Sequence, residues 1–164
     1  MNESLTPLLD AIDAGDDELA EQAALHLTAA DVPALLTLAH ATDSDQRWWA
    51  VRGLAVCAGA EAVPALLANL GDSDAGVRAA TVMALAFIHQ RAPAAVEPHL
   101  DEAARLLADD DGMVRQAAAD TLAQCGDDAV PALARVIFQG DHQGARTRAA
   151  AALRKIATMK AAAV

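Results

Sequence analysis

The sequence predicts an all-α fold, an α-α superhelix of about five stacked helix–turn–helix repeats that together contain ten helices. The composition favours helices, because alanine accounts for 44 of the 164 residues, whereas Tyr is absent and the only aromatic residues are two Trp and two Phe. Alanine is the best helix former, and strands favour β-branched and aromatic residues. Two short motifs also alternate along the chain, and such internal repetition is typical of solenoids.

The first motif is Val-Pro-Ala-Leu, which begins at Val32, Val63 and Val130. Looser copies surround Pro7 and Pro98. Proline suits the first turn of a helix, where its missing N–H has no intrahelical partner to lose. Each copy therefore predicts the start of a first helix.

The second motif is an arginine followed by alanines and, seven residues later, by a leucine. It gives the pairs Arg47/Leu54, Arg78/Leu85, Arg115/Leu122 and Arg146/Leu153. Shortly before the first three arginines stand Asp43, Asp74 and Asp111, whose carboxylates suit the N-cap of a second helix. The first repeat aligns with the others through Leu25.

These motifs divide a single domain, residues 1–164, into repeats at about 4–30, 31–60, 61–92, 93–126 and 127–160. The fourth repeat is longer than its neighbours, because the leucines Leu85 and Leu122 are 37 residues apart. We expect the extra residues, around Arg91–His99, to lengthen its first helix or the loop before it.

The Asp-x-x-Val-Arg motif, followed by alanines, a leucine and Ala-Val-Pro, resembles HEAT repeats, and more narrowly the short bacterial subtype first described in phycobilisome lyases. The resemblance covers nearly the whole chain and is strongest over the second to fourth repeats. It implies a right-handed superhelix with first helices on the convex side and second helices lining the concave side. It specifies an architecture rather than one function.

A helical wheel places one side of each second helix opposite the buried stripe, and this side is expected to form the floor of the concave groove. The floor is apolar in its N-terminal half, and exposed apolar patches mark interaction sites. The expected partner-binding residues are Trp48, Val51, Arg52, Val82, Met83, Gln116 and Asp120. Trp49 is expected to fill the core, whereas Trp48 could either contact a partner or pack along its own repeat.

The repeated arginines have two readings: a basic row that clamps an acidic ligand, or a structural ladder that bonds aspartates in the turns. The neighbouring aspartates favour the ladder, since half-buried arginine needs such pairing. The expected ladder residues are Arg47, Arg78, Arg115, Arg146, Asp43, Asp74 and Asp111.

No catalytic, cofactor or metal site is expected. The five histidines lack metal-binding spacing, and no nucleophile or glycine-rich phosphate motif is present. Asp109–Asp111 is interpreted as a solvated turn. Cys57 and Cys125 align at one position of the second and fourth repeats, too far apart for a disulfide, and are expected to be buried.

The net charge of −11 argues against binding of nucleic acid, and therefore also against a DNA-binding solenoid of the DNA-glycosylase type. It favours a protein or peptide partner with a basic surface. Neither a signal peptide nor a membrane span is evident, so a cytoplasmic location without membrane contact is expected. The predicted function is a non-catalytic interaction scaffold; the alternative is a bilin-lyase-like accessory subunit or chaperone of an enzyme complex. The last repeat is basic and the first is acidic. An alternative is therefore that the last repeat of one molecule docks on the first repeat of another.

Overall fold

The computed structural model describes residues 5–162, which form α-helices and short 3-10 turns and contain no strand. The helices are α1 (Thr6–Ala14), α2 (Asp17–Ala24), α3 (Val32–Leu38), α4 (Ser44–Cys57), α5 (Val63–Asn69), α6 (Ala75–Arg91), α7 (Pro93–Val96), α8 (Leu100–Arg105), α9 (Gly112–Gln124), α10 (Val130–Gln139) and α11 (Gln143–Ala162). No helix in this range is both long and apolar enough to cross a membrane.

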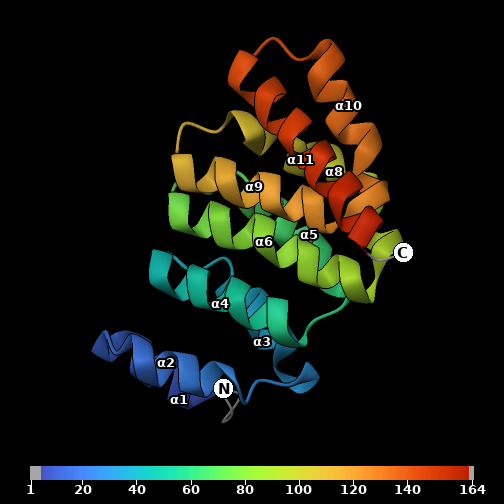
Figure 1. The fold of residues 1–164 in the computed structure, drawn as a ribbon. Coiled ribbons are helices and arrows are strands. Elements are labelled where there is room, and N and C mark those ends of the chain that lie inside the picture. Colours follow the sequence, from blue (N-terminus) through green and yellow to red (C-terminus); the bar gives the residue numbers. More distant parts are fainter. Residues whose placement is uncertain (1–4, 163–164) are drawn as a thin grey trace.

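The helices stack as successive pairs in which each first helix packs on the second helix that follows it (Figure 1). The pairs are α1/α2, α3/α4, α5/α6, α8/α9 and α10/α11. The second helices α4, α6 and α9 lie side by side in one layer, and α11 packs obliquely against α9. The first helices α3 and α5 lie behind that layer in the view. The all-α superhelix expected from the sequence is confirmed.

Proline opens the first helices, as the motif predicts. Pro7, Pro33, Pro64 and Pro131 occupy the first or second position of α1, α3, α5 and α10. The fourth pair differs, because Pro98 lies in a 3-10 turn ahead of α8, which is only six residues long. The extra residues of this repeat extend α6 to Arg91 and form α7, so they lengthen the connection before α8 rather than α8 itself.

Side-chain caps begin the second helices. Asp16, Asp43, Asp74 and Asp111 each accept a hydrogen bond from a backbone N–H in the first turn of the following helix, at 2.7 to 3.0 Å. In the last pair His142 takes this place, with Nδ1 accepting from the Ala145 N–H. Such a cap stabilises a helix by about 1 kcal/mol, because it satisfies a donor that the helix itself leaves free.

The repeated leucines form the core of the stack. Leu54, Leu85 and Leu122 of the second helices are fully buried, and burying one such side chain contributes about 1.5–3 kcal/mol. Repeat 1 departs from this pattern, because α2 ends at Ala24 and Leu25 is 69% exposed. Leu27 is buried there instead, so the alignment of repeat 1 through Leu25 does not place a core residue.

Candidate functional site

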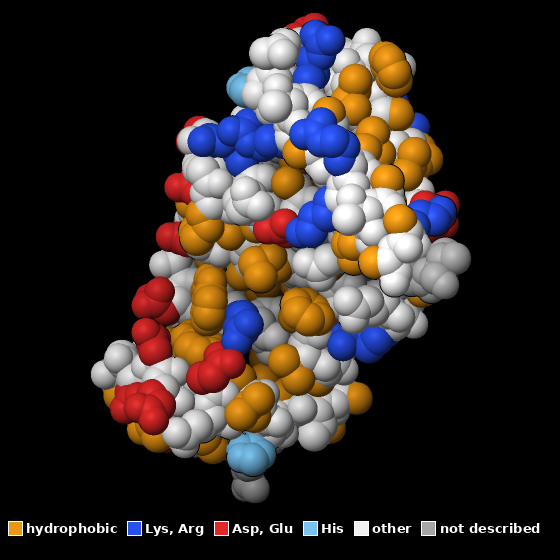
Figure 2. All heavy atoms as spheres, viewed as in Figure 1, with side chains coloured by type: hydrophobic (Ala, Val, Ile, Leu, Met, Phe, Trp, Pro, Cys, Tyr) orange, Lys and Arg blue, Asp and Glu red, His pale blue; other side chains and the backbone are white. Residues whose placement is uncertain are grey.

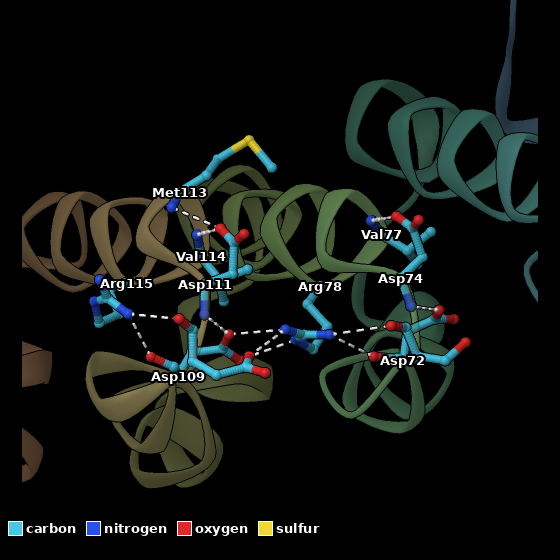
Figure 3. A network of polar contacts seen from close by, with 11 residues as sticks. Asp72, Asp74, Val77, Arg78, Asp109, Asp111, Met113, Val114 and Arg115 are labelled. Atoms are coloured by element: carbon cyan, nitrogen blue, oxygen red, sulfur yellow. Dashed lines mark hydrogen bonds and ion pairs between the residues drawn. The ribbon is translucent and has the colours of Figure 1, made fainter.

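Two arginines join successive second helices through the turns between them. The Arg47 guanidinium donates to both carboxylate oxygens of Asp72, at 2.7 and 2.8 Å. Arg78 makes the same two-bond contact with Asp109, at 2.9 and 2.8 Å (Figure 3). In both pairs the arginine side chain is 13% exposed and the aspartate 8%. Parallel two-bond contacts of this kind are among the stronger and more directional interactions in proteins.

The remaining N–H groups of these arginines bond the turn in front of their own helix. Nη1 of Arg47 donates to Ala41 and Thr42 carbonyls, and Nη1 of Arg78 donates to the Asp72 carbonyl at 2.9 Å. Each guanidinium therefore ties its own turn to the turn of the next repeat. A group with this many internal partners is not available to clamp an acidic ligand.

The pairing also fixes the charge of the aspartates. The hydrogen bond from Arg47 lowers the pKa of Asp72, and the hydrogen bond from Arg78 lowers the pKa of Asp109. Burial acts in the opposite direction on both carboxyls but is the smaller effect. Both aspartates therefore stay ionised well below neutral pH.

The identity of the bonded aspartates corrects the sequence interpretation. Asp43, Asp74 and Asp111 were expected in the ladder, but they cap helices, and within residues 5–162 they form no ion pair with an arginine. The aspartates that make two-bond contacts with the ladder arginines, Asp72 and Asp109, lie two positions before a cap, and Arg78 also bonds the exposed Asp110 at 2.9 Å. The interpretation of Asp109 as part of a solvated turn is therefore wrong, because the guanidinium of the preceding repeat covers it.

The ladder ends after Asp109. Arg115 donates only to the backbone carbonyls of Asp109 and Asp110, and its buried Nε has no hydrogen-bond partner. The position six residues before Arg146, where the preceding repeats have Asp72 and Asp109, is occupied by Gly140. Arg146 is exposed and forms no ion pair within residues 5–162.

An apolar groove lies on the face formed by the second helices. It has a volume of about 180 Å³ between α4 and α6 and is also lined by a residue of α9. We define the apolar groove by its large side chains, Trp48, Met83, Phe87 and Met113. Met83, Phe87 and Met113 are exposed and Trp48 is half-buried. Figure 2 shows hydrophobic side chains gathered over the middle of this face.

Trp48 is held in place on two sides. Its ring packs edge-to-face against buried Trp49, with centroids 4.8 Å apart and planes at 86°. The Arg52 guanidinium lies 5.5 Å from the Trp48 ring centroid, and this guanidinium bonds Glu21 of α2 at 2.7 Å. Trp48 therefore presents a fixed aromatic surface at the groove, while Trp49 fills the core as expected.

A second hollow adjoins the apolar groove on the side of α2. Trp48 and Gly76 line both, and the second has a volume of about 490 Å³. We call it the acidic pocket, because its charged lining residues are all carboxylates: Asp17, Glu21, Asp45 and Asp74. One rim of the apolar groove is thus negative, and only Glu21 among these carboxylates forms an ion pair in the described part of the chain.

Two of the expected floor residues are not accessible. Val51 and Val82 are fully buried, so the expectation that they line the groove is wrong. In the middle of the stack a second helix is covered on three sides, by its own first helix and by the second helices before and after it. The contact between α6 and α9 shows this, since the Thr121 hydroxyl donates to the Val82 carbonyl at 3.0 Å.

The polar end of the expected site lies on α9. The Gln116 amide donates to Asp120 at 2.9 Å, and Lys155 of α11 bonds the same carboxylate at 2.8 Å. The Gln116 hydrogen bond, and then the Lys155 bond, lower the pKa of Asp120. This part of the face is therefore polar and internally bonded, in contrast to the apolar groove.

Sequence reasoning missed Phe87 and Met113. Phe87 lies nine residues after Arg78, and Met113 lies two residues before Arg115. Phe87 lies four residues after Met83, and Met113 lies three residues before Gln116, so each is one helical turn from an expected floor residue. Neither was found, because only the positions one, four, five and eight after each arginine were assigned to the floor.

The described residues hold no group of three or more side chains suited to a metal ion. Cys57 and Cys125 are free thiols. Burial raises the pKa of Cys125 to about 12 and, first among several causes, raises the pKa of the half-buried Cys57. Both are therefore protonated near neutral pH, and a protonated thiol is a poor nucleophile.

The comparisons with known proteins agree with this geometry. Residues 32–105 match the family model of HEAT repeats, and residues 114–139 match that of the PBS lyase HEAT-like repeat. A comparison with curated protein sequences finds no match.

Two solved structures have the same fold. The complex of CpcE and CpcF of phycocyanin lyase from Nostoc sp. PCC7120 gives a TM-score of 0.72 at 20% identity, covering 92% of this chain and 98% of the other. An engineered protein from the Northeast Structural Genomics Consortium gives a TM-score of 0.56 at 25% identity, covering 96% and 80%. The fold and the repeats thus define an α-solenoid.

More particularly, residues 32–105 of this solenoid match HEAT repeats, and residues 114–139 match the PBS lyase HEAT-like form.

Proposed function

We propose that this protein is a non-catalytic scaffold that binds an amphipathic, basic segment of a partner protein along its second-helix face. The observation that carries the proposal is the apolar groove with its negative rim. Three exposed large side chains and a fixed tryptophan lie together there, next to four carboxylates. A cytoplasmic location would fit this role.

The chemistry of the groove supports a partner of this kind. Tryptophan and methionine are enriched at protein interfaces, and methionine adapts its shape to irregular apolar partners. The carboxylates of Asp17 and Asp45 would attract lysine or arginine beside the apolar contact, which increases both encounter rate and specificity. The groove has a volume of about 180 Å³, which suits a few apolar side chains projecting from one face of a helix or extended segment.

A pair of designed peptides tests the charge and the apolar contact together. The first probe is an amphipathic helix with a leucine face and lysine elsewhere, and the second replaces its lysines with glutamate. Trp48 and Trp49 are the only tryptophans, so intrinsic fluorescence reports directly on the groove. We expect the leucine–lysine peptide to shift the emission to shorter wavelength on binding and the leucine–glutamate peptide to have no effect.

A matched pair of variants locates the binding surface. Met83 and Met159 are 47% and 49% exposed, but only Met83 lines the groove. Met83→Lys should lower the affinity for the leucine–lysine peptide about tenfold or more, equivalent to about 1.4 kcal/mol. Met159→Lys should leave this affinity unchanged. Equal affinity of both variants, or equal binding of the glutamate peptide, would refute the proposal.

A second candidate is an accessory role beside a bilin lyase. It is favoured by the PBS lyase HEAT-like repeat at residues 114–139 and by the likeness in fold to the CpcE–CpcF complex. A linear tetrapyrrole such as biliverdin could stack on Trp48 in the apolar groove. Titration with biliverdin should then produce an absorbance shift that Trp48→Ala abolishes, and the absence of a shift would remove this candidate.

A further inference from the structure

The two ends of the stack carry opposite charge. The chain contains no Lys or Arg before Arg47 and no Asp or Glu after Asp141. Helices α1 and α2 carry five carboxylates, whereas α11 carries five cations. Figure 2 shows the corresponding separation, with acidic side chains over the N-terminal helices and basic ones over the C-terminal helices. Such a distribution favours contacts between unlike ends.

The N-terminal end bears a groove of about 380 Å³ between α1 and α2. We call it the head groove; its lining residues are Pro7, Asp10, Ala11, Ala14, Leu19, Gln22, Ala23 and His26. None of them belongs to α3 or α4, so the groove does not lie in the contact between the first and second helix pairs. Its lining is mainly apolar, with Asp10 as its one charged residue apart from a histidine. Asp10 forms no ion pair within residues 5–162.

Internal alignment identifies the open side of the C-terminal end. Ala86 and Ala123 lie eight residues after Arg78 and Arg115, and both are buried inside the stack. The equivalent residue of α11 is Arg154, which is exposed, since no helix of the described residues covers it. Its guanidinium forms no ion pair in the described chain, whereas its neighbour Lys155 is bonded to Asp120. We call the surface of α11 around Arg154 the tail.

We propose that the head groove of one copy receives the tail of a second copy, so that molecules associate head to tail. The aliphatic stem of Arg154 would pack on the alanines and Leu19, and its guanidinium would bond Asp10. Arginine suits such a site, since its stem is apolar and its head is a planar donor to a carboxylate. The two surfaces lie at opposite ends, so the contact is heterologous and each molecule can bind one neighbour at its head and another at its tail.

This surface is separate from the apolar groove, so each proposal can fail alone. Sedimentation velocity across micromolar to millimolar concentration is the test. At low salt we expect the weight-average mass to rise with concentration beyond that of a dimer. In about 1 M salt, where the Debye length is about 3 Å, the protein should return to monomer. A monomer at every concentration in low salt, or a mass that stops at the dimer, would overturn the proposal.

Charge reversal identifies the contact. Asp10→Arg and Arg154→Glu should each weaken association about tenfold or more. A mixture of the two variants should associate again, through the intact head of one with the intact tail of the other and through the two reversed charges at the alternate contact. The double variant Asp10→Arg/Arg154→Glu should regain association. Asp13→Arg and Arg105→Glu make the same charge changes at exposed positions outside the two surfaces. Equal loss in these controls, or no association in the mixture, would show that the contact lies elsewhere.

Discussion

The junctions in the middle of this solenoid are joined differently from the junction near its C-terminal end. Between α4 and α6, and between α6 and α9, a half-buried arginine donates two hydrogen bonds to an aspartate. Between α9 and α11 the link is the exposed ion pair of Lys155 and Asp120, whose side chains are 51% and 41% exposed. Exposed pairs contribute about 0–1 kcal/mol, whereas breaking a buried pair costs several times more.

An arginine at the repeated position is therefore not sufficient to form an ion pair between successive repeats. Arg115 has the same place in its repeat as Arg78, but the aspartate that should receive it is absent, because Gly140 stands there. The bond needs an arginine in one repeat and an aspartate in the next. A motif confined to one repeat therefore identifies only half of the interaction.

The largest expected effect on stability comes from removing one arginine–aspartate pair of the ladder. Arg78→Ala should lower the free energy of unfolding by up to about 3 kcal/mol, because the half-buried Asp109 carboxylate would lose its two hydrogen bonds from the guanidinium. Arg115→Ala should cost only about 1 kcal/mol, because that side chain bonds carbonyls alone and its Nε is already unsatisfied. Urea denaturation of both variants measures the difference. Equal losses would contradict the distinction between central and terminal junctions.

A smaller effect is expected at the missing rung itself. A Cβ at Gly140 would lie 2.5 Å from the Val136 carbonyl oxygen, and a backbone atom cannot move away easily. Gly140→Ala should therefore destabilise the protein by about 2 kcal/mol. Gly71 is the matched control in the turn before α6, since a Cβ there meets nothing within 4 Å. Thermal unfolding of the two variants should separate them; a Gly140→Ala protein as stable as Gly71→Ala would show that the turn adapts.

The smallest effect concerns acid. The arginines lower the pKa of Asp72 and Asp109 in the folded state, so their contribution to stability is fully present above about pH 4. It is lost as the pH falls through the lowered folded-state pKa values, because the unfolded chain then binds more protons. Arg47→Ala should make the loss of stability in acid shallower, since it restores the pKa of Asp72 towards its ordinary value. Urea midpoints measured from pH 6 to pH 3 check this slope, and parallel curves for variant and wild type would contradict it.

The candidate site was predicted in part. The wheel found Trp48, Arg52 and Met83, which do line the groove, because they lie opposite the core on an exposed stripe. It failed for Val51 and Val82, which it treated as facing solvent although neighbouring helices cover them. It also could not assemble the acidic pocket, whose carboxylates come from three different helices or their caps.

Local sequence features specify most of the helices, their order and the residues at which they begin. Proline at the first turn, aspartate at the caps and leucine in the core act within one repeat, and each acts through local backbone geometry or burial. Which face of the second helices is exposed to solvent, and which aspartate pairs with each arginine, follow from the tertiary structure alone. These depend on the offset between neighbouring helices, which is set by packing between repeats that are about 30 residues apart in the chain.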